Sequence, residues 1–417
     1  MTHDSDADVL QTLADEWRRF AAVECTQDTL YVAICSLVAQ SSDLLGLCLQ
    51  TRPEQRRPNL LLAAIHERVL AGESHALSDY FPSVGGQRAP DAELGATLRD
   101  FVAQQQGPIS AHLRHRHTQT NEIGRCVALW PVLAHIAQES GGAALALLDV
   151  GSSAGLNLGV DAYTLCYHCG GASVHVGGAP RTDVPLLRCE LRGERSPLDG
   201  LREPAGGWRL SHRLGLDPMP VDVRDTDATR WLQACVWPCD LVRQQRLVLA
   251  LELARQHGWQ VQQTGPSCIE AIHTWLDGLP SAVQPVVLNS WVLCYFSDQE
   301  RARHEQAMID LVRQRGVVWV SAETPSLRPT DMALPGTPPH DPKAPRCGAR
   351  SATMRAKSGS AHWPGRIRMA HGCSGWGRRC SPGQRNDSQR ARHHGLHNSS
   401  CWRPAMRRDA FLKSYWP

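Results

Sequence analysis

Lysine is absent from the first 340 of the 417 residues, because the three lysines of the protein are Lys343, Lys357 and Lys413. Arginine supplies the strongly basic side chains in this part of the chain. Schiff-base catalysis needs a lysine amine, and a P-loop needs a Gly-Lys-Ser/Thr sequence, which occurs nowhere in the chain. The sequence therefore excludes both kinds of chemistry from residues 1–340.

Long apolar runs are absent as well. No run approaches the roughly 20 residues needed to span a bilayer, and the acidic first residues lack the basic region and apolar core of a secretory signal. Fifteen cysteines are scattered without a disulfide framework, several of them inside apolar helical patterns. This usage is typical of reduced, buried thiols. We therefore expect a cytoplasmic protein without membrane contact.

The charge is divided unevenly along the chain. Residues 341–417 contain 16 Lys and Arg against 3 Asp and Glu, whereas the first 340 residues contain 28 against 38. An acidic body argues against nucleic-acid binding by the folded part. Binding of nucleic acid through the basic segment stays open as an alternative, since that segment also carries Trp363, Trp376 and Trp402.

The last part of the chain, residues 336–417, differs in composition from the rest. Residues 341–417 contain only three Ile, Leu or Val side chains. Such a segment buries too little apolar surface to offset its ordering entropy, so we predict disorder. Our hypothesis is that a reading-frame change near residue 340 replaced the natural end. We then expect no strand after the last one predicted below, which would leave that strand as an exposed edge.

The stretch from Leu145 to Tyr163 combines a strand, a turn and a helix start. The apolar run at 145–150 predicts a buried parallel strand. Residues 151–155 are all small, which predicts a tight turn, and the spacing of Leu156, Leu158 and Val160 predicts the first turn of a helix. A strand, a small-residue turn and a helix together form a corner typical of nucleotide binding.

This corner resembles the first motif of class I S-adenosylmethionine-dependent methyltransferases, in which an acidic residue precedes Gly-x-Gly-x-Gly. Gly151 and Gly155 match the outer glycines, and Ser153 replaces the middle one. The resemblance implies S-adenosylmethionine on this turn, held by Asp149, Gly151, Ser153, Gly155 and Asn157. It also implies an acidic residue at the end of the second strand that binds the ribose hydroxyls. Asp217 is the first candidate for that position and Asp222 the second.

Two other interpretations of the turn stay open. The same residues spell Gly-x-Ser-x-Gly, the nucleophile elbow of α/β-hydrolases, with Ser153 as nucleophile and a histidine from among His212, His257, His273 and His304. The second interpretation is a structural turn that binds no ligand. Because the elbow normally follows several strands and residues before Leu145 read as helical, the order of elements favours the cofactor loop.

Further polar candidates flank the turn. Gln119, Asn121 and Glu122 precede an apolar helix, where they either cap the helix or line a pocket beside the turn. Methyl transfer needs mainly alignment and, for some acceptors, a base. We take Glu122 and Asn289 as candidate catalytic residues, and Gln119, Asn121 and Tyr163 as candidate substrate-binding residues.

The pattern of the chain predicts three parts: a helical region at 1–139, an α/β domain at 140–335, and the basic segment. Five predicted strands alternate with helices, at Leu145–Val150, Trp208–Leu216, Gly258–Gln262, Val286–Trp291 and Val317–Ser321. This alternation predicts a Rossmann-like, doubly wound, mostly parallel sheet. An inserted hairpin region at 166–207 carries one Cys-x-x-Cys pair, and because zinc sites normally use two pairs we expect no metal.

Four segments resemble an uncharacterised bacterial family of unknown function. They are Pro58–His66, Thr118–Glu122, Asp149–Leu158 and Arg230–Pro238. The resemblance covers roughly residues 15–325 and implies a methyltransferase-like protein with a small-molecule or unknown acceptor. A non-catalytic or inactivated member of the family is the alternative.

Overall fold

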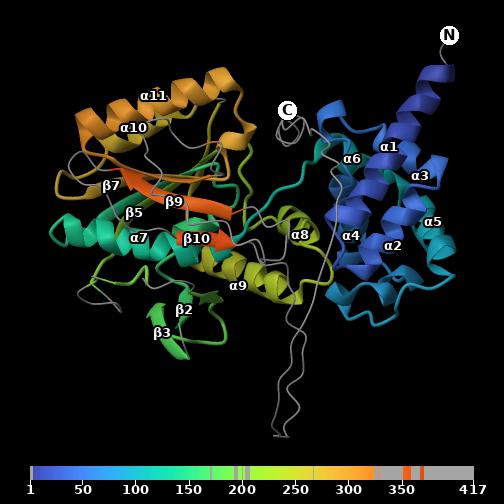
Figure 1. Cartoon of the computed structure of the whole chain (residues 1–417), viewed down its shortest axis with the longest axis horizontal. Coiled ribbons are helices and arrows are strands. Elements are labelled where there is room, and N and C mark those ends of the chain that lie inside the picture. Colours follow the sequence, from blue (N-terminus) through green and yellow to red (C-terminus); the bar gives the residue numbers. More distant parts are fainter. Residues whose placement is uncertain are drawn as a thin grey trace, which may run out of the picture.

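The computed structural model describes residues 3–169, 171–191, 196–199, 201, 207–265, 267–323 and 327, together with two strands at 351–357 and 367–370. Two bodies lie side by side in Figure 1. One is a group of helices formed by the N-terminal residues, and the other is a sheet covered by helices.

The N-terminal part is helical, as its apolar periodicity predicts. Its α-helices are α1 (His3–Val23), α2 (Thr29–Val38), α3 (Ser42–Cys48), α4 (Pro58–Leu70), α5 (Leu94–Gln104) and α6 (Gln106–His115). Side chains of Asp28 and Ser41 cap α2 and α3 by accepting backbone N–H groups. Large apolar side chains such as Trp17, Tyr31 and Phe101 form one buried cluster.

The second part is built on a sheet of five parallel strands. In spatial order they are β8 (Val318–Glu323), β7 (Gln284–Ser290), β1 (Leu145–Val150), β5 (Leu210–Asp217) and β6 (Val261–Gln263). The central strand β1 pairs along its whole length with β5 on one side and β7 on the other. The chain adds strands to one side of β1 and then to the other, so the strand order reverses between β1 and β7. All six β1 residues are buried.

Helices cover both faces of this sheet (Figure 1). On one face lie α7 (Cys126–Glu139), α8 (Thr226–Ala234) and α9 (Leu241–His257), and on the other lie α10 (Ile269–Asp277) and α11 (Asp298–Arg315). Alternate residues of a strand face opposite sides. Leu147 therefore packs with α7 and α9, whereas Leu148 packs with α10 and α11. The result is a mixed α/β architecture with a parallel sheet.

The helix predicted to follow the turn is not formed. A single 3-10 turn, η5 (Leu156–Gly159), stands there instead. It ends close against the ring of Trp259, and the chain then continues into a strand whose Leu165 and Tyr167 are buried in the core. This strand, β2 (Thr164–Cys169), belongs to a small sheet with β3 (Ala172–Gly177) and β4 (Leu186–Glu190), in the region predicted as an inserted hairpin.

The expectation that no strand follows β8 is also wrong. A strand β9 (Ser351–Lys357) pairs antiparallel with β8, and β10 (Ile367–Ala370) pairs antiparallel with β9. As a result, β8 is not an edge strand. The predictions of disorder and of a reading-frame change for residues 336–417 otherwise concern positions outside the described residues.

Helix α8 joins the two bodies. Its Arg230 donates a 2.6 Å hydrogen bond to Glu67 of α4, whose carboxylate also lies 2.7 Å from His112 of α6. Trp231 is buried among the N-terminal helices, while the next residue, Leu232, is buried in the core of the sheet. Two of the sequence segments that resemble the bacterial family, 58–66 and 230–238, therefore pack against each other.

No single helix among the described residues has both the length and the apolar character needed to cross a bilayer. Helices α2 and α3 reach this length and apolar character only when counted together, and a bend of 100° separates the two helices.

Candidate functional site

The turn after β1 adopts an unusual backbone conformation. Gly151, Ser153 and Gly155 all have positive φ, at 72°, 52° and 70°. Glycine adopts this region freely, but a side-chain-bearing residue is strained there by about 1–2 kcal/mol. Gly151 also lies so close to Val292 that a Cβ atom would overlap that side chain. The turn therefore needs glycine at Gly151, and Ser153 must be held in place by its surroundings.

Three segments hold Ser153. Its backbone N–H donates to Asp217 Oδ2 at 2.7 Å, and its carbonyl accepts from the Val221 N–H at 3.1 Å. Its hydroxyl accepts a 3.0 Å bond from the Asn121 side chain, whose oxygen in turn accepts from the Ala154 N–H at 3.3 Å. The turn, the end of β5 and the polar run before α7 thus meet at this residue.

Asp217 closes β5 and lies against the turn. Its second oxygen, Oδ1, accepts the Met219 N–H at 2.8 Å. Burial raises the pKa of Asp217, and the hydrogen bonds from Met219 and Ser153 oppose that shift. Asp222 is exposed, and its carboxylate accepts the Arg224 N–H of its own loop. Of the two acidic candidates, Asp217 is the one in contact with the turn.

Asp149 and Asn157 form a second polar pair beneath the turn. The Asn157 side chain donates to Asp149 Oδ2 at 3.1 Å, and Asn157 Oδ1 accepts from the Cys126 thiol at 3.8 Å. Asp149 is buried, and burial raises its pKa to about 7, although the bond from Asn157 and the charge of Arg125 oppose the shift. This carboxyl group therefore titrates near neutral pH.

Glu122 both caps a helical turn and forms ion pairs. It accepts the Gly124 N–H at 2.7 Å, and its carboxylate lies 2.8 Å from Arg243 and 3.6 Å from Arg246, both on α9. Burial acts to raise the pKa of Glu122, but Arg243 and Arg246 outweigh it, so the pKa is lowered. Glu122 is thus a fixed negative charge.

The other predicted residues lie in three different surroundings. Gln119 is half-buried and donates to the Met219 carbonyl at 3.4 Å, which places it beside Asp217. Tyr163 is fully buried, and its hydroxyl donates to the Leu156 carbonyl at 2.6 Å within the core. Asn289 is buried on the face covered by α10 and α11. There its side chain donates to Ser321 and Glu323 and accepts from Trp319.

Arg125 is a buried residue at this site that the sequence analysis did not single out. It donates to the carbonyl and hydroxyl oxygens of Ser290, at 3.0 and 3.3 Å, where β7 ends. The next residue, Trp291, has a φ of 57°, and its ring lies 5.8 Å from the Arg125 guanidinium. Burial lowers the pKa of Arg125. Nothing local marks this arginine, because its partner Ser290 is 165 residues further along the chain.

Glu323 lies at the adjacent end of β8. Its Oε1 accepts the backbone N–H groups of Val292 and Leu293, at 2.9 and 3.2 Å. Burial raises the pKa of Glu323, while these hydrogen bonds oppose the shift. The ends of β1, β5, β7 and β8 therefore carry one group of buried polar side chains. In open parallel sheets, ligands bind at this edge, where the strand order reverses.

The hydrolase interpretation lacks a base. The Ser153 hydroxyl is bonded to an amide, which does not accept a proton, and none of the four candidate histidines is hydrogen-bonded to it in the described part of the chain. His304, for example, is buried beside Cys268 on the α11 side of the sheet.

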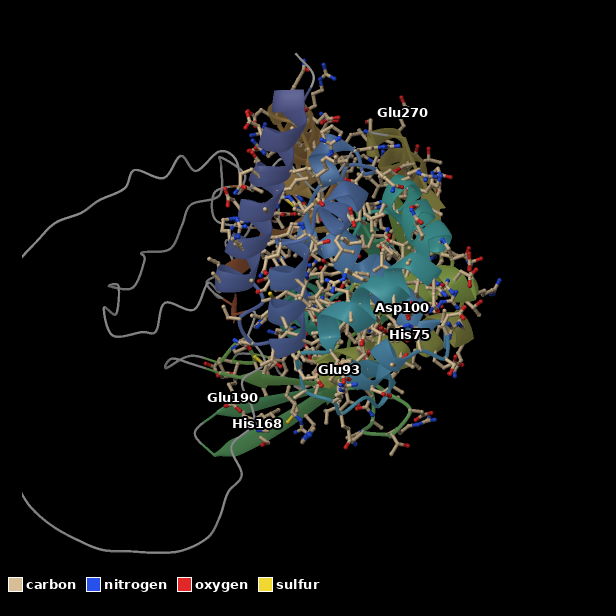
Figure 2. All side chains as sticks on the ribbon, turned by 90° about the vertical axis from the view of Figure 1, so that its right-hand side faces the viewer. His75, Glu93, Asp100, His168, Glu190 and Glu270 are labelled. Atoms are coloured by element: carbon tan, nitrogen blue, oxygen red, sulfur yellow. The ribbon has the colours of Figure 1, made fainter. Side chains whose placement is uncertain are left out.

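The inserted sheet holds the polar residues around the Cys-x-x-Cys pair. His168 on β2 lies opposite Glu190 on β4 (Figure 2), and its Nε2 is 3.3 Å from Cys166 Sγ. No group of three or more His, Cys, Asp or Glu residues suited to a metal ion occurs among the described residues.

Comparison with protein families gives one match over most of the chain. A family model described as an uncharacterised protein conserved in bacteria (DUF2332) matches residues 14–377. A comparison with curated proteins gave no match. The matched range includes both bodies of the fold and every residue of the site.

Proposed function

The chain belongs to this conserved bacterial family, and we propose that it is a class I S-adenosylmethionine-dependent methyltransferase with a Rossmann-like sheet. The observation that carries the proposal is the strained turn at Ser153, which the carboxylate of Asp217 holds from the neighbouring strand. A strained conformation that several hydrogen bonds maintain is typical of a ligand-binding turn. The order of the parallel strands, with reversal next to β1, supports the same conclusion.

The donors and acceptors at the turn fit this cofactor. Each Asp217 oxygen accepts one backbone N–H and keeps a lone pair for a ribose hydroxyl. Asp149, with Asn157, offers a carboxylate to an amine. The Ser152 hydroxyl is buried and has no hydrogen-bond partner among the described residues, which leaves one further polar group for a ligand. When bound, S-adenosylmethionine supplies an activated methyl group.

The protein contributes mainly alignment in this proposal. Asn121 positions the turn through Ser153 and Ala154, and Gln119 fixes the loop after β5. Glu122 acts as a positioning residue for the arginines of α9, because its pKa is lowered. Asn289 orders the ends of β7 and β8. Asp149 is the carboxyl group that can hold or release a proton near neutral pH.

The test is a calorimetric titration of S-adenosylmethionine and S-adenosylhomocysteine into the full-length protein. We expect Asp217→Asn to weaken binding at least about tenfold, since it removes a charged acceptor. Asp222→Asn removes the same charge from an exposed loop and should bind like the wild type. Circular dichroism establishes that each variant is folded. Absence of binding by folded wild-type protein would contradict the proposal.

A serine hydrolase is the second candidate, because a nucleophile elbow also places its serine on a sharp, strained turn. Ser153→Ala separates the two functions. It abolishes a hydrolase that uses Ser153, whereas we expect cofactor affinity to change less than about tenfold, because the backbone N–H that bonds Asp217 is kept. Ester hydrolysis by the wild type that disappears in this variant would favour the hydrolase.

A further inference from the structure

Arg125 carries a buried charge on which the carboxylates of Glu122 and Glu323 act without forming a direct ion pair. It is 8% exposed and forms no ion pair with another described residue, since its hydrogen bonds go to Ser290. Its Nε atom is buried and has no hydrogen-bond partner among the described residues. An unpaired buried charge is costly, and arginine is the side chain best suited to binding carboxylate and phosphate groups.

Two further arginines lie next to this position. Arg243 and Arg246 of α9 share the single carboxylate of Glu122, and their side chains are 27% and 24% exposed. The 3-10 turn that carries Arg125, η4 (Ile123–Arg125), begins directly after Glu122. Three guanidinium groups therefore lie around one ion-paired carboxylate. The first 340 residues of the chain carry more acidic than basic side chains, so such a cluster is not explained by composition.

The location of this cluster is that of a ligand site. Ser290 ends β7, and β7 is the neighbour of β1 at the point where the strand order reverses. The strained residue Trp291 follows directly. A tryptophan with positive φ is a rare conformation that persists only where its surroundings impose it.

We propose that Arg125, Arg243 and Arg246 bind a carboxylate or phosphate group of a ligand at the ends of β1 and β7. The anion enters past the partly exposed Arg243 and Arg246, and Arg125 binds it at the buried end. This chemistry has two sources, the amino-acid carboxylate of the cofactor or the anionic group of a separate ligand. The inference rests on the proposed function for the first source only.

The first arm of the test compares two probes by calorimetry. S-adenosylhomocysteine has the carboxylate, and 5′-methylthioadenosine lacks it. If the cofactor is the source, Arg125→Gln weakens S-adenosylhomocysteine binding at least about tenfold and leaves 5′-methylthioadenosine unchanged. The matched control is Arg255→Gln, which removes the same charge from the last turn of α9.

The second arm measures thermal unfolding with millimolar inorganic phosphate. If a separate anionic ligand is the source, phosphate raises the unfolding midpoint of the wild type and of Arg255→Gln, but not of Arg125→Gln or Arg246→Gln. If Arg125→Gln fails to fold, the variants Arg243→Gln and Arg246→Gln are used in both arms of the test, because these side chains are partly exposed.

The outcomes separate this inference from the proposed function. Arginine-dependent protection by phosphate without any S-adenosylhomocysteine binding supports the anion site and contradicts the methyltransferase. Binding of S-adenosylhomocysteine that no arginine variant alters, together with phosphate effects equal in all variants, overturns the anion site and leaves the methyltransferase standing.

Discussion

Ser153 has the positive φ that glycine adopts freely, in the middle of a turn that several hydrogen bonds hold. Its positive φ costs about 1–2 kcal/mol, while the hydrogen bond that its hydroxyl accepts from Asn121 contributes about 1 kcal/mol. Strain and hydrogen bond therefore nearly cancel. A glycine would remove both, and an alanine would remove only the hydrogen bond.

We predict that Ser153→Ala lowers the free energy of unfolding by about 1 kcal/mol. Ser153→Gly should stay within about 1 kcal/mol of the wild type, because relief of strain offsets the lost hydrogen bond. Urea denaturation measures both. An alanine variant more stable than the glycine variant would show that Ser153 is not strained.

Asp149 makes stability depend on pH. Burial raises its pKa from the ordinary 3.8 to about 7 in the folded protein. Between these values the folded state keeps a proton that the unfolded state has released, so the free energy of unfolding falls as pH rises. The stabilisation is complete below about pH 4 and is lost as pH passes about 7.

Asp149→Asn replaces this group by a neutral amide of similar shape. We expect the variant to gain stability relative to the wild type between pH 5 and pH 8, by on the order of 1 kcal/mol or more. Asp222→Asn, in an exposed loop, is the control. Parallel pH profiles for wild type and Asp149→Asn, measured by urea denaturation, would refute the assignment.

Local sequence brought out Asp149 and Asp217 as candidates but not Arg125. Asp149 and Asp217 stand at the ends of strands that apolar runs mark, so their position follows from the chain itself. Arg125 gains its surroundings from Ser290 and Trp291, which only the folded sheet brings near. Tyr163 looked suited to a ligand but faces the core, because the chain after the turn continues as a strand.

Apolar runs identified the fully buried central strand well. The predicted bounds of β1 agree with the structure, because a continuous apolar run marks this strand. The prediction of a helix after the turn was wrong, because apolar residues at 156, 158 and 160 fit the period of a strand as well as that of a helix. Strands β9 and β10 were missed because their residues are poor in Ile, Leu and Val.

Helices α4, α6 and α8 meet at the carboxylate of Glu67. Burial acts to raise its pKa, but the hydrogen bonds from His112 and Arg230 outweigh it and bring the pKa to about 2. The unfolded side chain has a higher pKa, so these bonds stabilise the fold above about pH 4.5. That stabilisation is lost as pH falls through about 2.

We predict that Glu67→Gln costs about 3 kcal/mol or more at pH 7, because it removes a buried carboxylate and leaves the partly buried Arg230 without its partner. The difference from the wild type should shrink as pH approaches 2. Glu73→Gln removes an exposed partner of Arg68 and should cost less than about 1 kcal/mol. A Glu67→Gln variant as stable as Glu73→Gln would contradict the role of this network.

At the scale of the whole molecule, the adjacent residues Trp231 and Leu232 are buried in two different hydrophobic cores. Loss of either core therefore disturbs the other. We predict one calorimetric unfolding transition for the whole protein, and Trp231→Ala should lower its free energy of unfolding by about 3–5 kcal/mol. Val242→Ala, at a residue 68% exposed, is the control. Two separate transitions would contradict the prediction.

A helix that belongs to two cores also restricts movement. Two domains swing about a hinge when the residues between them are free to change their backbone angles. Here the packed helix α8 bridges the two bodies beside the connecting segment 116–122, with Trp231 in one core and Leu232 in the other. This packing therefore opposes opening and closing of the two bodies about a hinge. Any path for a ligand to Asp217 and Arg125 must come from rearranged loops and side chains at the end of the sheet.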